Sequence, residues 1–173
     1  MQPPNLKHEW TAGDGTRVTI RTIQPEDREI EQAFVSGLSS HSKYLRFFAA
    51  VSELSPKLLD QFTQVDFPRE MALIATINVE TQEQEIGVAR FVQGGLQGTA
   101  EFAVVVADNW QGRGVGRELL HHLFSVAQGV GIEQIEGIVL RENQIMLRLC
   151  RELGFTVRQY PDDVELVRIS KEI

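Results

Sequence analysis

The spacing of apolar residues changes repeatedly along the chain, and each change marks the boundary of an expected element. Apolar residues at alternate positions predict strands, whereas apolar residues three or four positions apart predict amphipathic helices. On this pattern we expect strands over residues 17–23, 70–78, 85–93, 99–107, 135–140, 156–160 and 164–169, and helices over residues 25–38, 55–62, 114–129 and 143–153.

The order of these elements, β-α-α-β-β-β-α-β-α-β-β, predicts an α/β protein in which helices cover both faces of a mixed sheet. Short loops within residues 70–107 favour antiparallel neighbours, and the strand–helix–strand unit of residues 99–140 favours a parallel pair. Residues 1–15 are polar and contain Pro3 and Pro4. We therefore expect a flexible N-terminal arm over residues 1–15 and a single domain over residues 16–173.

Composition narrows the partners that the chain can have. Its 173 residues carry a formal net charge of −7, which argues against nucleic acid and is compatible with a cationic acceptor such as an amine. The apolar runs are too short to cross a bilayer, so we expect no membrane partner. A single cysteine, Cys150, excludes an internal disulfide and fits a reducing, cytoplasmic location. No two of the four histidines have metal-ligand spacing on one helix face, so no metal site is expected.

The most informative segment joins the strand that ends near Ala107 to the helix of residues 114–129. It is a glycine-rich turn that runs directly into the helix, with the sequence Gln111-Gly112-Arg113-Gly114-Val115-Gly116-Arg117. Such a turn presents free backbone N–H groups and the positive end of the helix dipole, a combination that binds an anion such as pyrophosphate.

Two common phosphate-binding motifs fit this turn poorly. A Rossmann fingerprint requires G-x-G-x-x-G in a first strand–helix unit, and a Walker A loop requires Gly-Lys-Ser or Gly-Lys-Thr. The spacing here differs from the first pattern, and the second is absent. A tight turn whose glycines serve only close packing is the remaining alternative.

The turn resembles the Gln/Arg-x-x-Gly-x-Gly/Ala motif of the GNAT family of N-acetyltransferases. Residues 143–155, which end in Arg-Glu-Leu-Gly-Phe, resemble the second signature helix of that family, and the element order is also that of its fold. Three further segments, residues 42–48, 69–75 and 100–104, resemble the acetyltransferase domain of bacterial protein lysine acetyltransferases.

The resemblance implies transfer of an acetyl group from acetyl-CoA, as co-substrate, to a primary amine by direct attack in a ternary complex. Backbone N–H groups of the turn would bind the pyrophosphate, and a free strand edge would pair with the pantetheine amides. Asn143 matches a family position whose side chain often bonds the pantetheine, a helix N-cap is the alternative role for Asn143, and Met146 would pack nearby. The expected cofactor-binding residues are Val104, Val105, Val106, Gln111, Gly112, Arg113, Gly114, Val115, Gly116, Arg117, Asn143 and Met146.

Glu101 is the candidate catalytic residue. A protonated amine cannot attack a thioester, so a general base must remove its proton directly or through water. Glu101 interrupts an apolar strand, so we expect its carboxylate to face a cleft, partly buried, on the same side as Ala103 and Val105. The resemblance implies the same role, because related lysine acetyltransferases carry a catalytic glutamate at the matching position. A solvated glutamate at a strand end is the alternative.

A general acid for the departing CoA thiolate is harder to assign. Many members of the family place a tyrosine on the last helix, and counting from Asn143 this position is Cys150. A thiol can donate a proton, but a buried structural cysteine is the favoured interpretation. Unassisted departure of the thiolate and donation by Tyr44 are the alternatives.

The sequence therefore favours an acetyl-CoA-dependent N-acetyltransferase whose acceptor is a protein lysine. A small amine such as a polyamine or an aminoglycoside is the first alternative acceptor, and a CoA-binding sensor without turnover is the second alternative function. An enclosed acidic acceptor pocket would favour the small amine, whereas an open groove at Glu101 would favour the protein.

Overall fold

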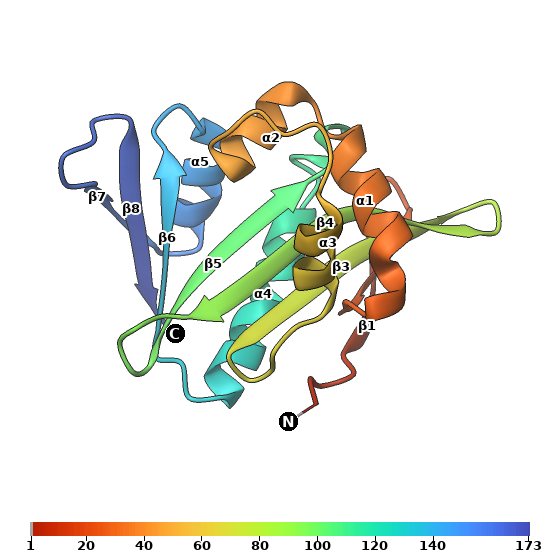
Figure 1. The fold of residues 1–173 in the computed structure, drawn as a ribbon, viewed down its shortest axis with the longest axis horizontal. Helices are drawn as coiled ribbons and strands as arrows, with labels where there is room; N and C mark the ends of the chain where they lie inside the picture. Colours follow the sequence, from red (N-terminus) through yellow and green to blue (C-terminus); the bar gives the residue numbers. More distant parts are fainter. Residues whose placement is uncertain (1) are drawn as a thin grey trace.

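The computed structural model describes residues 2–173 and contains one eight-stranded mixed sheet with the strand order β1-β2-β3-β4-β5-β6-β8-β7 (Figure 1). The strands are β1 (Lys7–Thr11), β2 (Arg17–Thr22), β3 (Glu70–Val79), β4 (Gln82–Gln93), β5 (Thr99–Val106), β6 (Gln134–Leu140), β7 (Thr156–Gln159) and β8 (Leu166–Glu172). The helices are α1 (Arg28–Gly37), α2 (Ser40–Phe47), α3 (Pro56–Thr63), α4 (Val115–Gly129) and α5 (Gln144–Glu152), with 3-10 turns η1 (Pro25–Asp27) and η2 (Asp108–Trp110).

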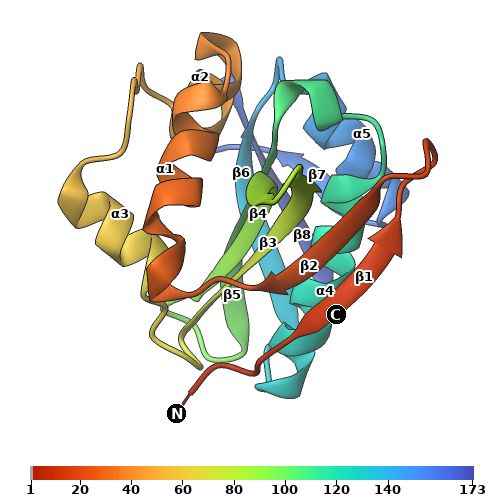
Figure 2. The ribbon, with the colours of Figure 1, turned by 90° about the vertical axis from the view of Figure 1, so that its right-hand side faces the viewer.

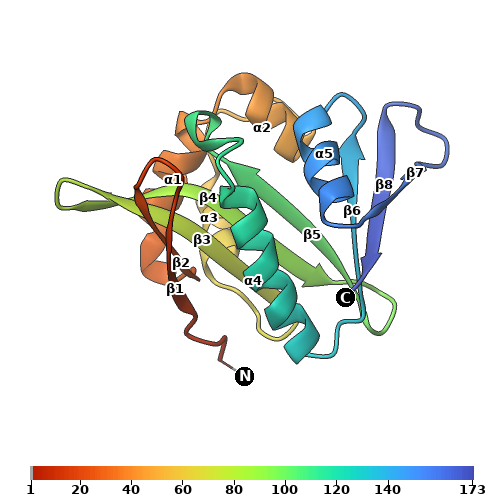
Figure 3. The same cartoon turned by 180° about the vertical axis from the view of Figure 1, so that it is seen from behind.

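Helices cover both faces of the sheet, which confirms the predicted fold class. Helices α1 and α3 pack on one face over a core that includes Phe34, Leu59 and Ile74. Helix α4 crosses the other face, and its buried side chains, among them Leu119 and Leu123, contribute to a larger core that extends under α5 (Figure 3). The sheet therefore holds α4, and the turn that precedes it, in a fixed position.

Strand pairing follows the prediction and creates an opening in the sheet. β3, β4 and β5 are antiparallel neighbours, and β5 and β6 are parallel. The parallel pair is short, extending only from Thr99↔Gln134 to Glu101↔Glu136, whereas β5 stays paired with β4 as far as Val106. Beyond Glu101 the two parallel strands diverge (Figure 1), so residues 102–106 of β5 have no strand partner on the β6 side.

Two elements were not predicted from the sequence. β1 lies within the segment expected to be a flexible arm, and that expectation is wrong for Lys7–Thr11, because this segment pairs with β2 over its whole length. It is an edge strand in which only Trp10 is partly buried, so no alternating apolar pattern marks it. Helix α2 was also missed. Its start depends on the Ser39 side chain, which accepts the Ser42 N–H.

Boundaries differ by a few residues elsewhere. β4 begins at Gln82 rather than at residue 85, and β8 begins at Leu166 rather than at residue 164. The view in Figure 2 shows the β1–β2 hairpin running beside α4. None of the helices in the described residues is long and apolar enough to span a bilayer.

Candidate active site

A cleft with a volume of about 870 Å³ opens where β5 and β6 diverge. Residues of β5 and β6 line it from the sheet, and residues of α2, of the turn before α4 and of α5 line it from the sides. Ligand-binding pockets for small molecules commonly have volumes of roughly 300–1,000 Å³. The cleft is therefore large enough for an extended ligand.

The cleft brings together most of the residues predicted for the site. Val115 and Arg113 are the two predicted residues whose side chains lie elsewhere. Val115 is buried in the core, and Arg113 forms an ion pair with Asp14 at 2.9 Å, so only their backbone groups belong to the turn. The predicted residues that line the cleft are Glu101, Val104, Val105, Val106, Gln111, Gly112, Gly114, Gly116, Arg117, Asn143 and Met146.

The glycine-rich turn adopts a backbone that favours glycine. Gly112 has a φ of 73° and Gly114 has a φ of 92°, both in the left-handed region. Gly114 is the N-cap of α4, and its carbonyl accepts the Glu118 N–H at 3.0 Å. The N–H groups of residues 115–117 therefore lie in the first turn of α4 and have no acceptor within the helix. Together with the helix dipole, they form an anion-binding arrangement.

Replacement of Gly114 by alanine should distort this turn. An added Cβ would lie 3.3 Å from two ring atoms of Trp10, and the positive φ is strained for any residue that carries a side chain. We expect Gly114→Ala to lower the free energy of unfolding by about 1–3 kcal/mol and to weaken acetyl-CoA binding. Urea unfolding and calorimetric titration with acetyl-CoA measure the two effects. Gly13→Ala is the control, since its Cβ would meet nothing within 4 Å, and an equal loss there would contradict the steric argument.

Asp108 connects α2 by hydrogen bonds to the segment that precedes the glycine-rich turn, and these contacts were not predicted from the sequence. Its carboxylate accepts the Ser39 N–H at 3.0 Å, the Ser39 hydroxyl at 2.7 Å and the Ser42 hydroxyl at 2.7 Å. Burial raises the pKa of Asp108, but these hydrogen bonds outweigh it and hold the pKa below its usual value. The Gln111 amide also donates to the Val106 carbonyl at 3.1 Å, which connects the turn to the end of β5.

Glu101 occupies the point where the sheet opens. It is the last residue of β5 that pairs with β6, opposite Glu136, and its side chain is exposed in the cleft. The expectation that Glu101 is partly buried is wrong, because the divergence of the strands leaves this position open to solvent. Arg46 of α2 lines the same cleft. Burial and the charge of Arg90 lower the pKa of Arg46 to about 10, so Arg46 is still positively charged at neutral pH.

Asn143 and Arg117 have structural partners of their own. The Asn143 side chain caps α5 by accepting the Met146 N–H at 3.1 Å. Arg117 forms an ion pair with Glu152 of α5, and both side chains are exposed. An exposed ion pair of this kind contributes little to stability, so it holds Arg117 only weakly.

Neither of the two candidate acids named from the sequence lines the cleft. Cys150 is fully buried in the core, and burial raises its pKa to about 12. A thiol that holds its proton so strongly is a poor donor to a CoA thiolate, as expected of the structural cysteine that the sequence favoured. Tyr44 is exposed on α2 and lies outside the set of lining residues.

Comparison with known proteins shows similarity to acetyltransferases. Residues 41–155 match the Acetyltransferase (GNAT) family. An acetyltransferase of Pseudomonas aeruginosa is 37% identical over 150 residues, which cover 87% of this chain and 81% of the relative. Acetyltransferase Pat of Mycolicibacterium smegmatis is 32% identical over 136 residues, which cover 78% of this chain but only 40% of Pat. The crystal structure of the GNAT domain of S. lividans PAT has a TM-score of 0.89 at 30% identity, with 100% of both chains covered.

Proposed function

Because this chain belongs to the GNAT family of acetyltransferases, we propose that it transfers an acetyl group from acetyl-CoA to the ε-amine of a lysine in a protein. The observation that carries the proposal is the open cleft, in which Glu101 lies at one end of the free edge of β5 and the glycine-rich turn follows the other end. Similarity to Acetyltransferase Pat and to the GNAT domain of S. lividans PAT supports it.

The residues of the cleft fit a CoA thioester. The free N–H groups at the start of α4 would bind the pyrophosphate. The edge of residues 102–106 that faces β6, which has no strand partner on that side, would pair with the pantetheine amides as it would with an added strand. The thioester supplies the electrophilic acetyl carbonyl. A backbone N–H of the same β5 edge would donate to the carbonyl oxygen and stabilise the negative charge that develops on it.

Glu101 would act as the general base. The ε-amine of lysine is protonated at neutral pH and must lose a proton before its nitrogen can attack. The exposed Glu101 carboxylate accepts that proton directly or through a water molecule. The new C–N bond then forms as the C–S bond breaks, the electron pair of the C–S bond leaves with the thiolate sulfur, and the second proton of the amine passes from the new amide nitrogen to water. The thiolate leaves without a proton from Cys150 or Tyr44, since neither lines the cleft.

The openness of the site favours a protein acceptor over a small amine. A small polycation would be held best in an enclosed acidic pocket. Here the base is exposed, and the positively charged Arg46 lines the same cleft. A lysine on the surface of a folded protein can reach an exposed carboxylate without an enclosing pocket.

The acceptor preference can be tested by measuring release of free CoA from acetyl-CoA. We expect a lysine-bearing protein, such as an acyl-CoA synthetase, to raise the rate at least tenfold above the rate with polyamines or aminoglycosides. Mass spectrometry of the protein should locate the acetyl group on lysine, and the same protein with its lysines chemically methylated is the control. Faster release with a small amine than with the protein would contradict the proposed acceptor.

A further inference from the structure

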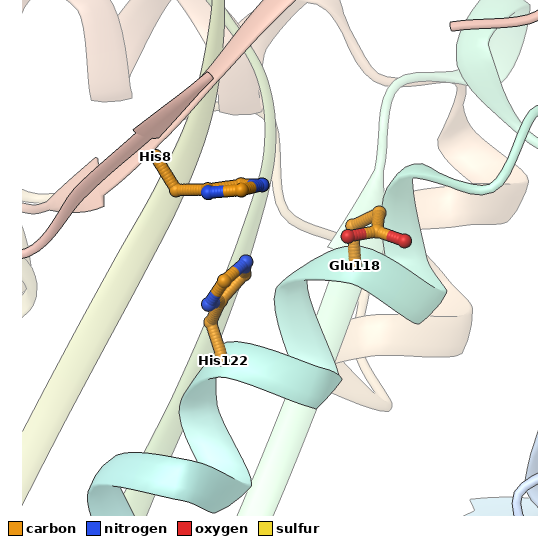
Figure 4. Close-up of side chains that lie close together, drawn as sticks. All are labelled: His8, Glu118 and His122. Carbon is orange, nitrogen blue, oxygen red and sulfur yellow. The ribbon is translucent and has the colours of Figure 1, made fainter. Parts of the chain in front are cut away.

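Three side chains with metal-binding atoms meet between β1 and α4, and none of them lines the cleft. His8 extends from β1, and Glu118 and His122 extend from α4 (Figure 4). One candidate ligand atom from each side chain lies within 4.8 Å of the other two. The rings of His8 and His122 are also adjacent, with centroids 4.5 Å apart.

The cluster is built on two elements that the fold holds together. Glu118 and His122 are four residues apart on α4, so they share one face of the helix. His8 pairs with Ile20 of β2, and Trp10 of the same strand packs against Gly114 at the start of α4. His8 is therefore held opposite the helix by both pairing and packing.

One ring nitrogen of the cluster lacks a hydrogen-bond partner. Nε2 of His122 is buried and has no hydrogen-bond partner among the described residues. Buried polar atoms in proteins are almost always paired, and an unpaired one often marks the position of an ion or a water molecule. A metal ion bound between the three side chains would give this ring the partner that it lacks.

We propose that His8, Glu118 and His122 bind a divalent transition-metal ion of the Zn²⁺ type, a site that is independent of the proposed acetyl transfer. Two imidazoles and one carboxylate, with a fourth position left for water, are a ligand set characteristic of Zn²⁺. Ca²⁺ and Mg²⁺ prefer sites made only of oxygen atoms, so the two histidines argue against them.

The geometry requires a small adjustment. Metal–ligand distances of about 2.0–2.2 Å place the ligand atoms around a tetrahedral Zn²⁺ roughly 3.3–3.6 Å apart. The candidate ligand atoms lie within 4.8 Å of one another, so the side chains need to approach one another by at most about 1.5 Å. The His8 side chain is exposed, so no buried packing opposes this movement. The bound ion would then connect the β1–β2 hairpin directly to α4.

Zinc binding can be measured on the untagged 173-residue chain after dialysis against EDTA. We expect calorimetric titration with Zn²⁺ to show one site per chain. At a free Zn²⁺ concentration 100-fold above the dissociation constant, the midpoint of thermal unfolding should rise by roughly 5–10 °C. Absence of both effects in the parent protein would overturn the proposal.

Substitution of single histidines tests which side chains bind the Zn²⁺ ion. His8→Gln and His122→Gln should each weaken Zn²⁺ binding by roughly 100-fold or more and remove the thermal shift. His121→Gln is the matched control, since His121 is exposed and adjacent on the same helix but outside the cluster, and it should keep both effects. Binding that survives His8→Gln, or that is lost with His121→Gln, would refute the assignment. If His122→Gln changes the circular dichroism spectrum, the exposed His8 decides the test.

Discussion

Glu101→Gln should lower kcat by roughly 100-fold or more while the affinity for acetyl-CoA stays within about twofold. Glutamine keeps the size of the side chain and its capacity for hydrogen bonds, but it cannot accept a proton from the amine. Steady-state rates with a protein acceptor and calorimetric titration with acetyl-CoA measure the two quantities separately. The defect should shrink as the pH approaches about 10, because lysine amines then lose their proton without a base.

The matched control for this prediction is Glu136→Gln. Glu136 is paired directly opposite Glu101 on β6 but does not line the cleft, so its loss removes a nearby negative charge and leaves the proposed base in place. We expect less than a threefold change in kcat. An equal decrease of kcat in the two variants would mean that the negative charge of the two glutamates, rather than proton removal by Glu101, supports the rate.

The sequence predicted most of the fold because most elements bury an apolar face. The apolar periodicity of α4 and the alternating residues of β3 to β5 follow directly from their positions in the core. β1 and α2 escaped prediction because they are stabilised differently. β1 depends on hydrogen bonds to β2. α2 depends on the Ser39 cap and on the hydrogen bonds that Ser39 and Ser42 donate to Asp108, and none of these contacts leaves an apolar pattern.

Features of the candidate site that depend on local backbone conformation could be predicted from the sequence. Features that depend on contacts between distant segments could not. The glycines of the turn are visible in the sequence because few other residues adopt their conformation. The exposure of Glu101 depends on how far β5 and β6 stay paired, which no local pattern reports. The cluster of His8, Glu118 and His122 was hidden because one of its ligands lies on the unpredicted strand β1.

A second large effect, on the pH dependence of stability, should arise from a pair of buried carboxyl groups under α1. Glu31 of α1 and Glu85 of β4 are both almost fully buried, and their four carboxylate oxygens have no hydrogen-bond donor among the described side chains and backbone. Burial raises the pKa of both carboxyls, and the neighbouring Glu31 raises the pKa of Glu85 further, against a partial opposing effect of Arg90. We therefore expect the two groups to share one proton, with the carboxyl of Glu85 holding it and facing the Glu31 carboxylate.

This pair makes stability depend on pH in a direction that can be predicted. A carboxyl whose pKa is higher in the folded protein binds a proton that the unfolded chain has already released. Its contribution to stability is complete below the ordinary pKa of 4.5 and is lost as the pH rises toward the folded pKa. For one shared proton, the free energy of unfolding should fall by about 1.4 kcal/mol per pH unit over that interval.

Glu85→Gln should remove this loss. The glutamine amide can still donate to Glu31, and it cannot ionise, so the variant should be more stable than the parent at about pH 8, with the difference shrinking toward about pH 5. Glu83→Gln on the same strand is the control, for which we expect the opposite dependence of stability on pH. Hydrogen bonds from Arg21 lower the pKa of Glu83, so its contribution exists above pH 4.5 and is lost in acid. Urea unfolding at both pH values measures the differences, and a Glu85→Gln variant that is destabilised equally at both would contradict the shared proton.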